Sequence, residues 1–307
     1  QYLERNFPNG NYHSAYEAGF CGYWIHNKLK DLGVNSIVVN PADIPTIQKE
    51  KVQKEDGRDS RKIARSLRAG DLTAIYVPSL KTLEDRSLVR TRSTLVKDLT
   101  RNKNRIKSFL HFHGVDIPVT ISGNRWSNRF VKWLDELNMK EESGKQALQS
   151  IITASKNLRT SVLDVTRKIQ HLSKTESYQE QIILLRSIPG IGLLTAMMLI
   201  TEMETIDRFK SMDTLCGFIG LIPSTKSSGD SDMVGDITPR GHIILRAAII
   251  ESAWVAARLD PALTKCYHDY CKRMEPNKAI IRIAKKLLSR IRFVLKSKKT
   301  YVCSIIK

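Results

Sequence analysis

The stretch Asn35-Ser36-Ile37-Val38-Val39-Asn40-Pro41 decides the fold class of the N-terminal part of the chain. Its three consecutive β-branched residues, closed by a proline, predict a short buried strand. A second strand is expected at residues 12–16, an amphipathic helix at 20–32 and a further strand at 74–77. Strands and helices that alternate at this spacing predict an α/β fold with a mostly parallel sheet, although these strands are too few for a complete one.

An acidic pair stands at the head of the helical stretch 55–65, which reads EDGRDSRKIAR. Asp56 and Asp59 are three residues apart and share a helix face, so their carboxylates repel each other unless a cation or hydrogen bonds offset the charge. Mg²⁺ is commonly held by one or two carboxylates together with substrate phosphates. The structural alternative makes Asp56 the helix N-cap and places Asp59 in the first turn, where the helix dipole stabilises it.

The chain is strongly basic. It has 50 lysines and arginines against 31 aspartates and glutamates, a net charge of +19. This balance favours nucleic acid as a partner. No apolar run reaches the roughly 18–20 residues of a membrane-spanning helix, so we expect no membrane partner. Five scattered cysteines and no recognisable signal peptide indicate reduced thiols in a cytoplasmic protein.

The middle of the chain is predicted to be helical. Residues 80–112 are helical and basic, and a break at 113–118 precedes a second helical region. In that region apolar residues recur in steps of three and four, as in a coiled-coil seam, with Ser155 as the polar exception. We expect a helical hairpin that also supports self-association, as a homodimer or homotetramer. The seam consists of Ile151, Leu158, Val162, Val165, Ile169 and Leu172.

The C-terminal part contains a turn with two glycines, Pro189-Gly190-Ile191-Gly192, before the helix 193–202. Such a turn presents backbone N–H groups to a phosphate, as in a helix-hairpin-helix motif; the alternative is an ordinary helix connection. Together with the basic helices, the turn supplies the candidate nucleic-acid contacts. These candidates are Arg58, Arg61, Arg101, Arg105, Gly190, Gly192, Arg240, Arg246, Lys285, Lys286 and Arg290.

A loop with several serines, residues 221–241, contains a candidate nucleophile. Ser228 precedes a glycine that lets a phosphate approach the backbone, and nearby arginines would stabilise the developing charge. A serine needs a base or a metal ion for activation, and His242 and Lys226 are the candidate bases. The alternative is an ordinary polar surface loop.

In their order and spacing these motifs resemble the transposases of the insertion-sequence-110 family, also called DEDD transposases. The resemblance extends over essentially the whole chain. It rests on residues 15–19, 39–41, Asp56 and Asp59 with 61–64, 74–78, 188–192, 220–223, 227–229, 235–238, Gly241, Arg246 and 251–254.

The resemblance implies three domains: an RNase H-like (RuvC-like) domain at 1–80, a helical coiled-coil region at 81–180, and a mostly helical C-terminal transposase domain with the serine loop at 181–307. The family has a further aspartate on its first strand. The chain begins at Gln1, not methionine, and no aspartate precedes Glu17, so we expect the first domain to be incomplete at its N-terminus.

The resemblance also implies the chemistry. Glu17, Asp56 and Asp59 match family carboxylates that bind Mg²⁺, with Mn²⁺ as the alternative ion. Ser228 matches the serine that attacks DNA and forms a phosphoserine link during transposition. The implied partners are DNA and a structured noncoding guide RNA, and the implied location is the prokaryotic cytoplasm or nucleoid. Two other functions stay open: a RuvC-like junction nuclease that uses water, and a noncatalytic nucleic-acid-binding remnant.

Overall fold

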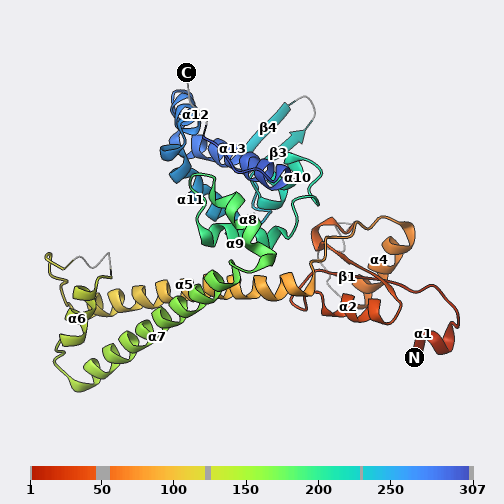
Figure 1. Ribbon diagram of the computed structural model, residues 1–307. Coiled ribbons are helices and arrows are strands. Elements are labelled where there is room, and N and C mark those ends of the chain that lie inside the picture. Colours follow the sequence, from red (N-terminus) through yellow and green to blue (C-terminus); the bar gives the residue numbers. More distant parts are fainter. Residues whose placement is uncertain (1, 46–55, 122–125, 229–230, 304–307) are drawn as a thin grey trace. The chain divides into compact units, whose positions relative to one another are not determined.

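The computed structural model describes residues 2–45, 56–121, 126–228 and 231–303 (Figure 1). The chain separates into two compact units, residues 1–79 and 80–307, and each is described by itself. The division into three domains stays a prediction.

The first unit is built on a small parallel sheet. Strand β1 (His13–Glu17) pairs in parallel with β2 (Asn35–Val39), and α2 (Trp24–Asp31) connects them. Val38 and Val39 are almost fully buried, as expected for the apolar strand. Helix α4 (Asp56–Ala69) packs against β1. The unit also contains α1 (Tyr2–Asn6) and the 3₁₀ helix η1 (Pro41–Asp43).

The predicted strand at 74–77 is wrong. Ala74 forms one isolated antiparallel bridge with Val39, and the N–H of Ile75 donates to the carbonyl of Val38 at 2.8 Å. Pro78 stands three residues after Ile75, and it has no N–H to continue a ladder. Within the described residues of this unit the sheet therefore has two strands.

The second unit begins with two long helices, α5 (Leu80–Phe112) and α7 (Glu142–Leu172), which pack against each other. The short α6 (Asn128–Glu136) lies near the end of α5 (Figure 1). The packing of α5 against α7 confirms the predicted hairpin within the chain. Of the predicted seam, Ile169 and Ser155 are buried and the other positions are half-buried. Self-association stays a prediction. A small core joins the three helices, made of Ile106, Leu110, Phe130, Leu134, Leu148 and Ile152.

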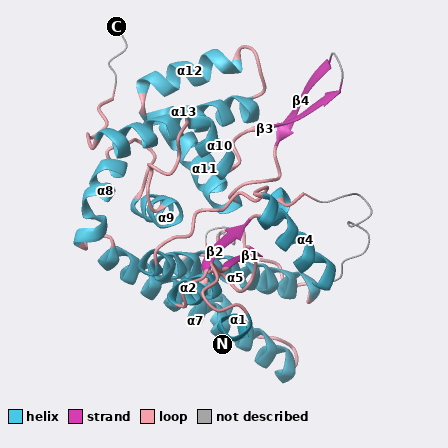
Figure 2. Cartoon of the chain, turned by 90° about the vertical axis from the view of Figure 1, so that its right-hand side faces the viewer, coloured by secondary structure: helices cyan, strands magenta, loops and turns pink. Residues whose placement is uncertain are grey.

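The remainder of the second unit is a helical core with one hairpin of strands. The helices α9 (Leu193–Met203), α11 (Ile243–Leu259) and α13 (Pro276–Ser297) each contribute buried apolar residues to this core. The hairpin of β3 (Pro223–Ser228) and β4 (Ser231–Ile237) projects from this core (Figure 2). No described helix combines the length and apolarity needed to cross a membrane. The other helices are α8 (Glu176–Arg186), α10 (Met212–Ile219) and α12 (Pro261–Cys271).

Candidate functional site

A groove in the first unit brings two of the predicted carboxylates together. Glu17 is the last residue of β1 and is exposed, whereas Asp59 lies in the first turn of α4 and is half-buried. Because α4 packs against β1, both side chains line one open cavity of about 490 Å³. Apolar residues of α4, among them Ile63 and Leu67, line it as well.

Asp59 has a lysine as its neighbour on α4. Its Oδ1 lies 3.3 Å from the ammonium of Lys62, in a partly exposed pair one helix turn apart. Asp56 is the first residue of α4, and its side chain lies outside the described part of the structure. Carboxylate oxygens are the ligands that Mg²⁺ and Mn²⁺ prefer. The described side chains do not by themselves make a group of three metal ligands, so the metal site stays a prediction.

The predicted serine loop is an antiparallel hairpin. Ser227 lies opposite Asp232 and Ser228 opposite Ser231, so Ser228 is the last residue of β3 before the turn. The prediction of a loop was wrong because serine, aspartate and glycine are typical turn residues, and their number here obscured two strands that pair along their backbones. The side chain of Ser228 lies outside the described part, and its nucleophilic role stays a prediction.

The base of this hairpin is held by close backbone packing. Gly220 (φ +84°) and Gly241 (φ +105°) face each other, and a Cβ on Gly241 would lie 2.5 Å from the Cα of Gly220. Arg246, on α11, donates from Nη1 to the carbonyls of Thr238 at 2.6 Å and Gly220 at 3.3 Å. Arg246 therefore fixes the hairpin base, and its predicted contact with nucleic acid is not tested by these bonds.

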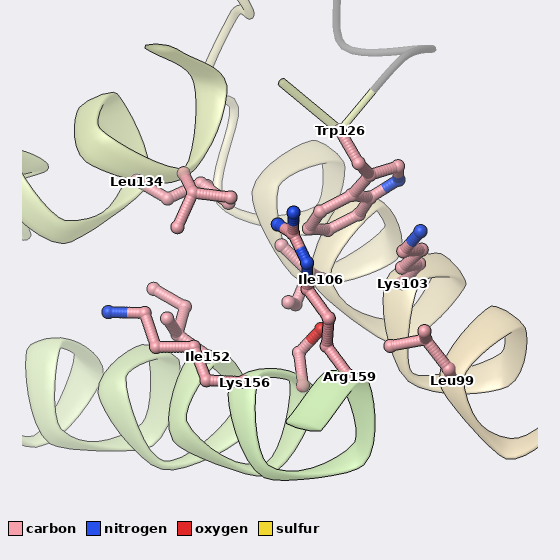
Figure 3. A pocket seen from close by; sticks show the side chains of 10 residues that line it. Leu99, Lys103, Ile106, Trp126, Leu134, Ile152, Lys156 and Arg159 are labelled. Atoms are coloured by element: carbon pink, nitrogen blue, oxygen red, sulfur yellow. The ribbon is translucent and has the colours of Figure 1, made fainter. Parts of the chain in front are cut away.

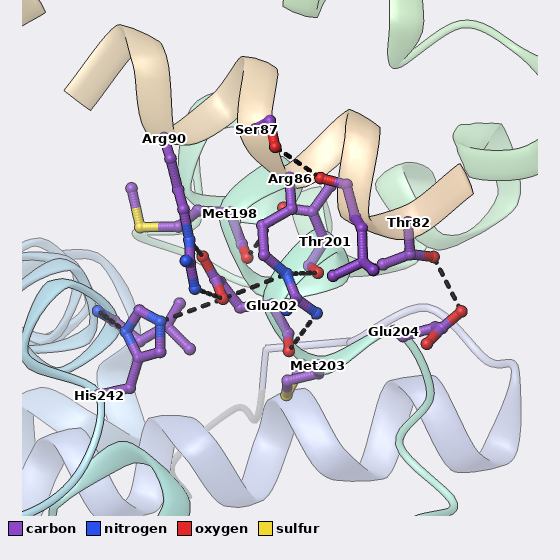
Figure 4. A network of polar contacts seen from close by, with 12 residues as sticks. Thr82, Arg86, Ser87, Arg90, Met198, Thr201, Glu202, Met203, Glu204 and His242 are labelled. Carbon is purple, nitrogen blue, oxygen red and sulfur yellow. Dashed lines mark hydrogen bonds and ion pairs between the residues drawn. The ribbon is translucent and has the colours of Figure 1, made fainter. Parts of the chain in front are cut away.

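A buried carboxylate, Glu202, lies at the centre of a network of polar contacts (Figure 4). Glu202, on α9, receives two hydrogen bonds from Arg90 of α5, at 2.7 and 2.8 Å, and its Oε2 lies 3.1 Å from His242 Nε2. Arg86 donates to the carbonyl of Thr201 at 2.9 Å and lies 3.4 Å from Glu202. Burial raises the pKa of Glu202, but the bonds from His242 and Arg90 outweigh it and lower this pKa to about 2.

His242 uses both ring nitrogens. Its Nδ1 accepts a hydrogen bond from the N–H of Leu245 at 3.2 Å and caps α11, while its Nε2 faces Glu202. A neutral imidazole with its proton on Nε2 satisfies both contacts. His242 is therefore a link between α9 and the start of α11, and neither nitrogen is available to act as the base of Ser228 in this arrangement.

Sequence reasoning missed this network, although a signal was present. Glu202 is the single charged residue of the helix 193–203 (LLTAMMLITEM). A carboxylate on an otherwise apolar helix must either face water or find buried partners. Arg86 and Arg90, spaced four residues apart on α5, are such partners. The sequence showed both arginines but not which carboxylate they would meet.

The two glycines of the 189–192 turn have different surroundings. Gly190 has a φ of +90°, and a Cβ there would lie 2.4 Å from the carbonyl oxygen of Ser252 on α11. Gly192 is the N-cap of α9 and is exposed, and a Cβ added to it would meet no atom within 4 Å. Gly190 thus permits close helix packing, and only Gly192 offers an open approach to a phosphate.

The remaining candidate contacts differ in exposure. Arg290 has structural partners: it donates to the Tyr301 hydroxyl at 2.8 Å and lies 3.4 Å from the fully buried Asp260. Arg101 forms a 3.1 Å pair with Asp98. Their contacts with nucleic acid stay predictions. Exposed candidates are Arg58, Arg61, Arg101, Arg105 and Arg240, and half-buried ones are Lys285, Lys286 and Arg290.

Two family models match the chain. Residues 12–114, which contain Glu17, Asp56 and Asp59, match a DEDD transposase model of the IS110 type. Residues 183–268, which contain the serine hairpin and Glu202, match the transposase IS116/IS110/IS902 family. Both matched regions are transposase domains, so the chain is of the transposase class.

Curated relatives agree with these models. A protein named putative transposase y4qE from Sinorhizobium fredii is 32% identical over 241 residues, 78% of this chain and 57% of the relative. The transposase for insertion sequence element IS1533 from Leptospira borgpetersenii is 32% identical over 196 residues, 62% of this chain and 55% of the relative. The chain thus spans little more than half the length of these two relatives. Its two matched regions are therefore domains of the IS110 type of transposase.

Proposed function

We propose that this chain cuts and rejoins DNA as the transposase of an insertion sequence, with Glu17, Asp56 and Asp59 binding Mg²⁺ and Ser228 attacking DNA. The observation that carries the proposal is the groove that Glu17 and Asp59 line together, although they are distant in sequence. Asp56 lies one helix turn before Asp59 and shares its helix face. The parallel pairing of β1 and β2 with α4 on β1 supports an RNase H-like arrangement.

In the proposed reaction the Oγ of Ser228 attacks a phosphodiester phosphorus. The serine hydroxyl loses its proton and a bond forms between Oγ and phosphorus. The bond between phosphorus and the sugar oxygen breaks, that oxygen takes up a proton, and the serine is joined to the DNA end. Mg²⁺, when bound, stabilises the charge on the phosphate and the leaving oxygen. Arg246 fixes the base of the hairpin that carries Ser228, and the Glu202–His242 pair fixes the first turn of α11 beside it.

The proposed partners are DNA, a structured noncoding guide RNA and further copies of the chain. The net charge of +19 supports the two polyanions. Exposed arginines on α4 and α5, such as Arg61 and Arg105, supply cations for their phosphates.

The test is a search for a covalent protein–DNA adduct. The product of the complete gene is incubated with DNA from the element's ends and Mg²⁺, then resolved on a denaturing gel. We expect an adduct with the wild type and with Ser227→Ala, the matched neighbour, and no adduct with Ser228→Ala. Glu17→Ala and Asp59→Ala should lose the adduct while keeping their thermal stability.

Each rival has its own outcome. Cleavage that persists in Ser228→Ala without an adduct would identify a nuclease that uses water. Wild-type protein that binds DNA but never cleaves it, with binding unchanged in Glu17→Ala, would identify a noncatalytic remnant.

A further inference from the structure

A cavity that the proposed chemistry does not use opens between α5, α6 and α7 (Figure 3). Its volume is about 300 Å³, the lower end of the range of roughly 300–1,000 Å³ for small-molecule pockets. Ile106 of α5, Leu134 of α6 and Ile152 of α7 give it an apolar floor, and Trp126 closes one side. The cavity therefore has the size and lining for a small flat ring system.

The sequence accounts for the cavity. Ser155 occupies a seam position of α7 where leucine, isoleucine or valine stands at the other positions, and it lines the cavity while being 8% exposed. A small side chain in an apolar seam leaves a volume that the facing helix does not fill. The polar exception of the seam thus coincides with a binding-sized space.

Cations surround this apolar floor. Lys156 is paired with Asp135 at 2.7 Å, but Lys103 and Arg159 have no acidic partner among the residues that the structure describes. The ammonium of Lys103 lies 5.3 Å from the centre of the Trp126 ring, and Arg159 reaches from α7 towards the same ring (Figure 3). Burial lowers the pKa of Lys103, as do the positive charges of Arg159 and of Lys107. An anion beside these two groups would relieve their repulsion.

We propose that this cavity binds one unpaired nucleotide, with its base against Ile106, Leu134 and Ile152 and its phosphate between Lys103 and Arg159. An apolar floor beside an indole ring suits the flat face of a base, and two unneutralised cations suit a phosphate. A base within a duplex is stacked and cannot enter such a cavity, so the ligand must be unpaired. The source of the nucleotide, a nucleic-acid strand, rests on the proposed function; the cavity chemistry does not.

The test compares three ligands by fluorescence: a duplex with one bulged 2-aminopurine, the same duplex fully paired, and free 2-aminopurine nucleotide. We expect the wild type to prefer the bulged duplex and to change its emission. Trp126→Ala should weaken binding of the bulged duplex by about five- to 150-fold and leave the paired duplex unaffected, because base stacking contributes about 1–3 kcal/mol. Trp126→Phe, which keeps a ring, should restore most of the preference.

Charge variants separate the cavity from general phosphate attraction. Lys103→Gln and Arg159→Gln should reduce the preference for the bulge, whereas Arg105→Gln, an exposed cation on the same helix as Lys103, should weaken both duplexes alike. Thermal melting identifies any variant that fails to fold.

Other outcomes are decisive in different ways. Free nucleotide binding that depends on Trp126 would support the cavity and place its ligand in solution. If the wild type and all variants bound both duplexes equally, the proposal that the cavity binds a nucleotide would be wrong, and the proposed function would be unaffected. No binding of any ligand would overturn both.

Discussion

The two units place their carboxylates in opposite environments. In the first unit Glu17 is exposed, and Asp59 has one partly exposed lysine partner. In the second unit the side chain of Glu202 is 3% exposed and lies within 3.4 Å of Arg86, Arg90 and His242. Surface ion pairs contribute about 0–1 kcal/mol, whereas removing one partner of a buried pair is strongly destabilising. Glu17 and Asp59 are therefore accessible to a ligand, whereas Glu202 stabilises the fold.

The largest expected effect follows directly from this contrast. Glu202→Ala leaves two arginines without their carboxylate, and we expect the free energy of unfolding to fall by about 3–5 kcal/mol. Glu17→Ala, its counterpart in the first unit, should change it by less than about 0.5 kcal/mol. Urea unfolding measures both, and hydrogen exchange at α9 localises the loss. Equal effects of the two substitutions would break the comparison.

Lowering the pH should destabilise the second unit by protonating Glu202. The pKa of Glu202 is about 2 in the folded protein against an ordinary value of 4.5. Because the folded value is the lower one, Glu202 contributes stability above pH 4.5 and loses it as the pH falls towards 2. The contribution is about 3 kcal/mol. Glu202→Gln should therefore flatten the stability profile between these pH values, and a profile parallel to the wild type would contradict the assignment.

Local patterns were predicted well from the sequence, and partners across the fold were not. The strand at Val38, the helix after Asp56 and the hairpin with Ser155 in its seam follow from short-range periodicity, and each is present. The Glu202 network and the cavity at Ser155 depend on which side chains meet after packing, and periodicity carries no such information. That Glu17 and Asp59 belong to one site was predicted from a resemblance, because no spacing rule relates residues so far apart.

The sequence of the turn with two glycines also does not reveal its packing, because the two glycines have different roles in the structure. Gly190→Ala places a methyl group 2.4 Å from the Ser252 carbonyl at a φ of +90°, and we expect a loss of about 2–3 kcal/mol in the free energy of unfolding. Gly192→Ala has open space and an ordinary φ of −83°, so the loss should stay below about 1 kcal/mol.

Thermal or urea unfolding of the two glycine variants decides between these roles. If Gly192→Ala were the more damaging substitution, the close packing of the turn against α11 would be wrong. DNA binding adds a second measurement, because only Gly192 has an open approach. A larger side chain there, as in Gly192→Gln, should weaken binding without unfolding the protein.

The smallest effect compares one tyrosine hydroxyl in each unit. Tyr301 donates to the buried Asp260 at 2.6 Å and accepts from Arg290 at 2.8 Å, whereas Tyr12 donates to the carbonyl of Phe7 at 2.7 Å in an exposed hydrogen bond. Tyr301→Phe leaves a buried carboxylate with one partner fewer, so we expect a loss of about 1–2 kcal/mol; Tyr12→Phe should lose less than about 0.5 kcal/mol, since water replaces its bond. Both variants keep their rings, so urea unfolding isolates the hydroxyl. Equal losses would show that burial does not set the strength of these bonds, and the contrast between the two units would then rest on charge alone.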